Sequence, residues 1–320
     1  MDTSHRSNSI APFVATTPPQ PKAKKNIMFR AWRPRPSFTA LVAVIGSLGS
    51  LFFALGIVII VYSNSLFEFE TRYDSLCSLN ADCNTEKFLI SQVVSKPVYV
   101  QYRITEFYQN NLRYMRSSVE EQLRDGVLLD KSALEDCEPY LTNREMSKTI
   151  SVLNTTLNPD EPAIPCGLAA YTFFNDTFDL VNLDSGKVYP ISDKNIAWES
   201  DKQYKFNNID LSKQWIDMKN ERFIIWMKIA PFENFIKTWG VINEDLPAGI
   251  YQFRVSNTWN NLIFGGQKFV ILQQVLFFGG RNFFLGGVFV AVGGLSILVV
   301  IFLIIRKVTH RRTFHNFDTN

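Results

Sequence analysis

The chain has 320 residues, of which 46% are hydrophobic and 20% are charged, and its net charge is +3. This apolar fraction is ample for a buried core and excludes a wholly disordered chain. The small net charge gives no sign of the basic surface typical of nucleic-acid-binding proteins.

The N-terminal segment, residues 1–37, carries seven basic residues and one acidic residue. Residues 1–25 are rich in Ser, Thr and Pro, which predicts a disordered tail. Just before the first long apolar run, Trp32, Arg33, Pro34 and Arg35 form a basic aromatic stretch that suits the lipid headgroup region.

Residues 38–63 contain no charged residue, and a helix of this length spans about 39 Å, enough to cross a bilayer. The run lies too far from the start to be typical of a cleavable signal peptide. Gly46 and Ser50 are four residues apart within it, a spacing that lets another helix approach closely.

Residues 64–282 separate this span from a second uncharged run, residues 283–305, which is about 34 Å long as a helix. Gly287 and Ala291 repeat the four-residue spacing of small residues there. The final segment, residues 306–320, has four basic residues and one acidic residue. By the positive-inside rule both tails are predicted to be cytoplasmic and the middle segment exoplasmic.

The predicted exoplasmic segment contains all four cysteines, Cys77, Cys83, Cys137 and Cys166. Thiols are normally oxidised in that compartment, so we expect disulfides rather than a free nucleophile. Three pairings are possible, and we favour a local Cys77–Cys83 bridge with a longer Cys137–Cys166 loop. The two Asn-X-Thr sequons, at Asn154 and Asn175, lie in the same segment and predict N-glycans.

Strand patterns in this segment predict a mainly antiparallel, sandwich-like β domain with short helices. They cover residues 97–104, 222–230, 249–255 and 267–275, and a helical period covers residues 107–123. No long helices separate the strands, which argues against a parallel sheet.

Catalytic motifs are missing from the segment. All three histidines, at positions 5, 310 and 315, lie in the tails, so a Cys-His or Ser-His-Asp site cannot form in the exoplasmic domain. The sequence has no P-loop or dinucleotide-binding fingerprint, and the spans have no ionisable residue to carry ions. We therefore expect no cofactor, no metal and no enzymatic activity, and a role in contacts with another protein.

Six segments in order resemble the cell division control protein 50 family, the β subunits of type-four P-type ATPases that flip phospholipids. They are VYVQYRITEFYQNNLRYMRS (98–117), IPCGLAAYTFFNDTF (164–178), AWESD (197–201), FIIWMKIA (223–230), LPAGIYQF (246–253) and GGRNFFLG (279–286). The resemblance implies a noncatalytic subunit in a heterodimer with the ATPase, needed for its folding, its exit from the endoplasmic reticulum and its transport cycle.

The resemblance also implies an address in the endoplasmic reticulum, Golgi, endosome or plasma membrane. We expect contacts with the partner and with membrane lipids at the Trp32–Arg35 stretch and at the small residues Gly46, Ser50, Gly287 and Ala291. Two alternatives from other classes are a two-span ligand-gated ion channel subunit and a stand-alone exoplasmic receptor or hydrolase.

Overall fold

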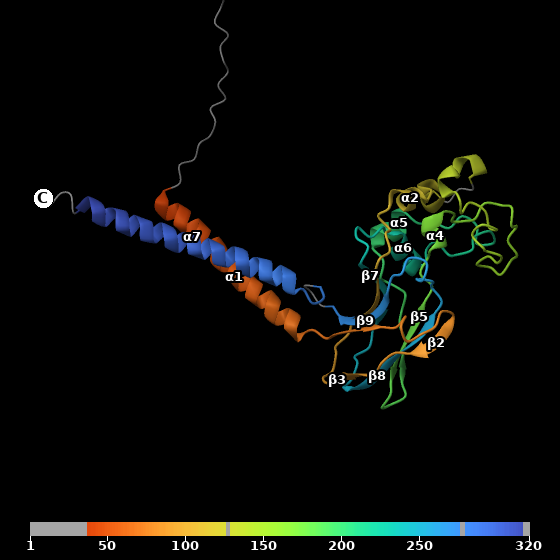
Figure 1. The fold of residues 1–320 in the computed structure, drawn as a ribbon, viewed down its shortest axis with the longest axis horizontal. Coiled ribbons are helices and arrows are strands. Elements are labelled where there is room, and N and C mark those ends of the chain that lie inside the picture. Colours follow the sequence, from red (N-terminus) through yellow and green to blue (C-terminus); the bar gives the residue numbers. More distant parts are fainter. Residues whose placement is uncertain (1–36, 126–128, 276–278, 316–320) are drawn as a thin grey trace, which may run out of the picture.

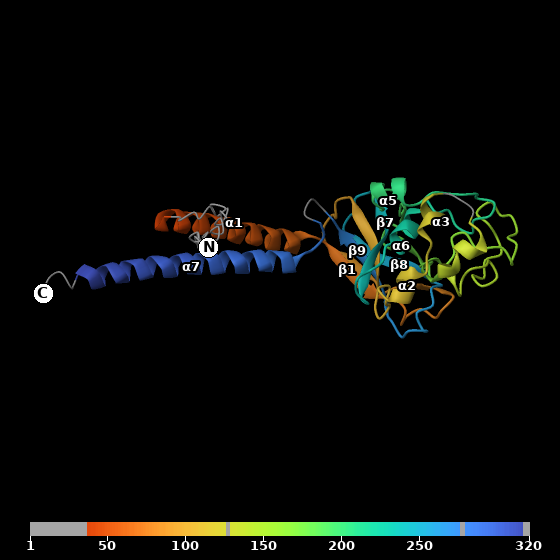
Figure 2. The same cartoon turned by 90° about the horizontal axis from the view of Figure 1, so that it is seen from above.

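The computed structural model describes residues 37–125, 129–275 and 279–315, with side chains up to residue 309. Two long helices, α1 (Phe38–Ser65) and α7 (Phe283–His315), pack side by side and extend from one end of a globular domain (Figures 1 and 2). Both are long and apolar enough to cross a membrane. The chain is thus a two-span membrane protein with a β-rich domain between its spans.

The globular domain contains two antiparallel sheets. In the first sheet the strand order is β1 (Glu68–Arg72), β9 (Lys268–Gln274), β4 (Val98–Ile104) and β7 (Phe235–Ile242). In the second it is β2 (Ala81–Asn84), β8 (Gly249–Asn257), β5 (Thr177–Asn182) and β6 (Val188–Tyr189), with β3 (Phe88–Ile90) also on β8. The predicted antiparallel sandwich is confirmed.

Side chains that alternate along the strands fill the space between the sheets. Every second residue of β4 is buried, and β8 has the same period. Phe178 of β5 meets Trp239 of β7 across the sandwich, with ring centroids 5.2 Å apart. The core of the sandwich is therefore largely aromatic.

A second lobe, made of short helices and loops, adjoins the sandwich (Figure 1). Its helices are α2 (Leu112–Arg116), α3 (Glu120–Arg124), α4 (Leu168–Tyr171), α5 (Glu199–Tyr204) and α6 (Glu221–Met227), with 3₁₀ turns at Lys131–Ala133 and Glu135–Cys137. A separate apolar cluster that includes Leu134, Met146 and Phe223 forms its core.

Two of the predicted elements are wrong. The strand expected over residues 222–230 is helix α6, and the single helix expected over 107–123 is two five-residue helices, α2 and α3. The strands at 97–104, 249–255 and 267–275 are present as β4, β8 and β9 with slightly different ends.

Candidate partner-binding surface

The two long helices meet along glycines that are seven residues apart. Gly49 and Gly56 lie on α1, and Gly286 and Gly293 lie on α7. A Cβ on Gly56 would lie 2.6 Å from the Val290 backbone nitrogen, a distance that no side chain tolerates. Seven residues make two helical turns, so each pair shares one face and lets the backbones touch.

The small residues predicted from four-residue spacing mostly lie outside this contact. A Cβ on Gly287 would meet nothing within 4 Å, and Ser50 and Ala291 are exposed. Gly46 faces α7 instead, where its Cβ would make an ordinary 3.8 Å contact with Val300. Ser50, Gly287 and Ala291 are therefore on helix surfaces that the described chain leaves open.

The basic aromatic stretch Trp32–Arg35 lies outside the described residues. The role of Gly49 and Gly56 was missed from sequence, although both helices carry the same signal. In each, two glycines are separated by seven residues, a spacing that places them on one side of a helix.

Three of the six motif segments meet in a buried junction between the sandwich and the second lobe. The rings of Tyr102 and Phe174 stack with centroids 3.8 Å apart. The side-chain carbonyl of Gln109 accepts a hydrogen bond from the Ala230 backbone amide at 2.9 Å. These residues come from the segments 98–117, 164–178 and 223–230. The motifs therefore join the two lobes.

The structure explains why the Pro-Cys-Gly sequence has a glycine at its third position. Gly167 has a φ of +97°, and a Cβ there would press against the Ser117 carbonyl oxygen. The next amide, of Leu168, donates to the Ser117 hydroxyl at 2.6 Å. Only glycine fits this close approach of two chain segments.

Lys268 is a fully buried cation in the sandwich core. Its Nζ lies 2.7 Å from Asp176 Oδ2 and also donates to the Asn257 side chain and, at 2.6 Å, to the Trp259 carbonyl. The Tyr73 hydroxyl donates to the same carboxylate at 2.6 Å. Burial lowers the pKa of Lys268 and raises the pKa of Tyr73 well above its ordinary value.

Every member of this network has a partner inside the protein, and neither Lys268 nor Asp176 is exposed to solvent. A substrate therefore has no access to them. Asp176 also accepts the backbone amides of Thr258 and Trp259, each at 2.6 Å. The network acts as a structural clamp that fixes the end of β8 to the segment just before β5.

The globular domain has an apolar groove of about 390 Å³ between α5, α6 and β7, which we call the tryptophan groove. It is lined by Ile196, Ala197, Trp198, Asp201, Ile224, Ile225, Lys228, Ile229, Ala230, Pro231, Phe235, Ile236, Lys237 and Thr238. The motif segments AWESD and FIIWMKIA thus form two of its walls.

Trp198 is the most prominent side chain of the tryptophan groove, with 68% of its surface exposed. The Lys228 ammonium sits over its ring, 3.2 Å from the centroid. Ile236, across the groove on β7, is 52% exposed. An exposed aromatic ring with a cation and apolar neighbours is typical of protein–protein contacts.

Glu221, at the start of α6, holds the loop that carries Trp198. Its carboxylate accepts the backbone amides of Asn195 at 3.0 Å, Ile196 at 2.7 Å and Ala197 at 2.9 Å. Burial acts to raise the pKa of this carboxyl, but the three amides and Lys202 outweigh burial and keep it below its ordinary value. The groove wall therefore depends on a charged Glu221.

Lys237 supports the floor of the groove from β7. Its Nζ donates to the carbonyls of Ile225, Trp226 and Lys228, the last two at 2.7 Å. These carbonyls end α6 and lack helical partners. Burial, with a smaller effect of the nearby Lys228 charge, holds the pKa of Lys237 well below its ordinary value.

The cysteines are joined as Cys77–Cys83 in the sandwich and Cys137–Cys166 in the second lobe. Both sequon asparagines, Asn154 and Asn175, are exposed. Among the described residues, no group of three or more His, Cys, Asp or Glu side chains is placed to hold a metal.

Comparison with known proteins finds one family model, described as the LEM3 (ligand-effect modulator 3) family / CDC50 family, which matches residues 57–313. Relatives include the putative ALA-interacting subunit 2 of Arabidopsis thaliana, 29% identical over 86% of this chain and 84% of that protein. Cell cycle control protein 50A of Bos taurus is 27% identical over 95% of this chain and 92% of its own length. Cell cycle control protein 50B of Homo sapiens is 27% identical over 84% of this chain and 87% of its own length.

Proposed function

Because the chain belongs to the LEM3/CDC50 family, we propose that it is the noncatalytic accessory subunit of a type-four P-type ATPase that moves phospholipids between membrane leaflets. The observation that carries this proposal is the extent of the match. It runs from within α1, through the whole globular domain, and into α7. A relative named as an interacting subunit aligns over 84% of its own length and 86% of this chain. ATP hydrolysis belongs to the partner, and this chain supports the partner's folding, its exit from the endoplasmic reticulum and its transport cycle.

In this proposal both tails are cytoplasmic and the globular domain faces the exoplasmic side. The basic tails support this orientation. So do the two disulfides and the two exposed sequons, which all lie in the globular domain. The complex would reside in the endoplasmic reticulum, Golgi, endosome or plasma membrane.

Two surfaces would contact the ATPase. Within the membrane, Ser50, Gly287 and Ala291 are small, exposed and unused by the α1–α7 contact, so a partner helix can approach closely there. Outside it, the tryptophan groove offers an aromatic anchor and a cation. The stretch Trp32–Arg35 would meet the partner's cytoplasmic face or the lipid headgroups.

Purification of the full chain from its own cells in mild detergent tests the proposal. We expect a large multi-span P-type ATPase among the proteins that co-purify, identified by mass spectrometry. An unrelated two-span glycoprotein, tagged and purified in the same way, controls for nonspecific membrane proteins. The absence of any P-type ATPase, or a stable homotrimer that conducts ions, would contradict the proposal.

A further inference from the structure

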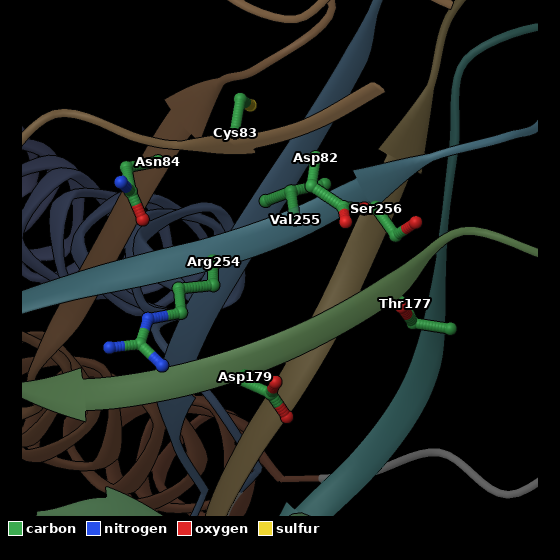
Figure 3. Close-up of a pocket in the computed structure, with 8 residues that line it drawn as sticks. All are labelled: Asp82, Cys83, Asn84, Thr177, Asp179, Arg254, Val255 and Ser256. Atoms are coloured by element: carbon green, nitrogen blue, oxygen red, sulfur yellow. The ribbon is translucent and has the colours of Figure 1, made fainter. Parts of the chain in front are cut away.

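Six polar side chains gather around a hollow of about 500 Å³ on the outer face of the second sheet, which we call the polar hollow (Figure 3). They form two rows across three neighbouring strands, because the paired residues stand opposite one another in register. The first row is Asp82, Ser256 and Thr177, and the second is Asn84, Arg254 and Asp179.

These six side chains do not satisfy one another. Arg254 stands opposite Asp179 in register, yet the two are not within ion-pair distance. In the part of the chain that the structure describes, none of the six makes a side-chain hydrogen bond or an ion pair. The polar hollow therefore has donors and acceptors that are free for a ligand.

The sequon residue Asn175 lies just before β5, two residues along the chain from Thr177 of the polar hollow. Burial alternates along this segment: Phe174 and Asp176 are buried, whereas Asn175 and Thr177 are exposed. Because side chains of an extended chain alternate between faces, Asn175 leaves the sheet on the same face as Thr177, about 7 Å further along. The Thr258 hydroxyl donates to the Asn175 carbonyl at 2.9 Å and holds this backbone in place.

We propose that the first sugars of the N-glycan that the sequon predicts at Asn175 lie in the polar hollow. The bond forms between Nδ2 of Asn175, which loses a proton, and the anomeric carbon of the first sugar, as the pyrophosphate of a lipid-linked oligosaccharide leaves. Asp82 and Asp179 accept hydrogen bonds from sugar hydroxyls, and Arg254 donates to sugar oxygens.

The charges of the polar hollow favour a neutral sugar over an ion. The two aspartates outnumber the one arginine, so the net negative charge disfavours an anion, and two separated carboxylates are too few ligands for a metal. A glycan brings hydroxyl groups that both donate and accept, which matches the mixture of groups present. Its tether at Asn175 keeps it at a high local concentration, so weak hydrogen bonds suffice to hold it.

The test uses the full chain made in eukaryotic cells and purified in mild detergent with whatever co-purifies. Mass spectrometry of glycopeptides first measures occupancy at Asn175. The native protein is then digested with an endoglycosidase, and the release rate is measured at each sequon. We expect the double variant Asp179→Ala/Arg254→Ala to release the Asn175 glycan about tenfold faster than the unchanged chain, because two hydrogen-bonding groups are lost.

Release at Asn154 in the same samples is the internal control and should not change. Arg144→Ala/Asp160→Ala removes an exposed ion pair in the second lobe and is the matched control variant. If the alanine pair fails to fold, Asp179→Val/Arg254→Met removes the same hydrogen-bonding groups and keeps more of the side-chain volume. The proposal would be overturned if Asn175 carried no glycan, or if the Asn175 glycan were released at the same rate from the double variant and from the unchanged chain.

Discussion

Several buried ionisable residues in this protein hold backbone segments in place. Glu221 collects three amides of one loop, and Lys237 collects three carbonyls at the end of α6. In the sandwich, Lys268 donates to the Trp259 carbonyl and pairs with Asp176, which accepts two backbone amides. Perturbed pKa values often mark active sites, but here burial lowers the pKa values of Lys237 and Lys268, and backbone amides lower that of Glu221.

Replacement of Glu221 by glutamine should destabilise the globular domain in a pH-dependent way. The variant loses a charged acceptor of three backbone amides, which costs about 2 kcal/mol at neutral pH. Because the folded pKa of Glu221 is lowered, its contribution is complete above the ordinary carboxyl pKa of 4.5 and is lost as the pH falls through the lower folded value. Thermal melting of both proteins from neutral to acidic pH should show the difference in Tm narrow with acidification.

Glu244→Gln serves as the control for this prediction. Glu244 pairs with Lys187 on the surface, where both side chains are largely exposed, so its loss should change Tm little at any pH. If the difference in Tm between Glu221→Gln and the unchanged protein stays constant down to about pH 3, the shape of the Glu221 side chain, and not its charge, stabilises the domain.

Helix α6 explains one limit of prediction from sequence. Residues 222–230 include Phe, Ile and Trp, which favour strands, so the composition predicted a strand. Tertiary contacts decide otherwise, since Phe223, Ile224 and Trp226 are buried in the two cores. The usable signal was Asn220, whose side chain accepts the amides of Arg222 and Phe223 and begins the helix.

The interrupted helix at 107–123 has a different reason. Its apolar period is real, but Ser117 turns the chain away between α2 and α3 to meet Gly167, fifty residues later. A contact so distant in sequence leaves no local signal. The sandwich and the two spans were predictable because alternation and uncharged length are local patterns, whereas the tryptophan groove needs three separate segments to be placed together.

Two substitutions by a large residue distinguish the α1–α7 contact from the helix faces that the described chain leaves open. One substitution lies in the contact and the other lies on an open face. Gly293→Leu places a side chain against the Phe53 backbone of α1, where a Cβ alone would come within 2.5 Å, so we expect a loss of about 2–3 kcal/mol. Gly287→Leu adds the same side chain where nothing lies within 4 Å. Thermal aggregation of the detergent-solubilised chain should show a lower Tm for Gly293→Leu only.

The same pair of variants also reports on the partner. If the face of Gly287 receives an ATPase helix, Gly287→Leu should reduce the amount of ATPase that co-purifies while its own Tm is unchanged. Full recovery of the ATPase with Gly287→Leu would assign that face to lipid. A lowered Tm for Gly287→Leu would instead mean that α1 and α7 pack differently from the structure.

At the scale of the whole molecule, the helix pair and the first sheet form one continuous unit. Helix α1 ends at Ser65 and β1 begins at Glu68, and β1 pairs antiparallel with β9, which leads back to α7. The Gln274 amide donates to the Phe67 carbonyl at 3.0 Å just beside the helices. A partner that grips both spans therefore also fixes the position of the tryptophan groove.

This continuity predicts how two distant contact surfaces combine. Trp198→Ala removes the exposed anchor of the groove, and loss of such an anchor typically costs about 2 kcal/mol of binding, or roughly 30-fold in affinity. Gly287→Leu acts on the membrane face. Because the two sites share no contacts, their free-energy losses should add, so the double variant should lose affinity by the product of the two single factors.

The measurement is the fraction of ATPase retained by each purified variant over a detergent dilution series, with Leu262→Ala as the control for loss of an exposed apolar side chain elsewhere in the domain. A double variant no weaker than Trp198→Ala alone would mean that the membrane face makes no independent contact. A Trp198→Ala variant that binds like the unchanged chain would remove the groove from the interface. A loss of affinity in the double variant that equals the product of the two single losses therefore supports a rigid connection between the spans and the sandwich, as well as both contact surfaces. With a flexible connection, one contact could be lost with little effect on the affinity of the whole protein.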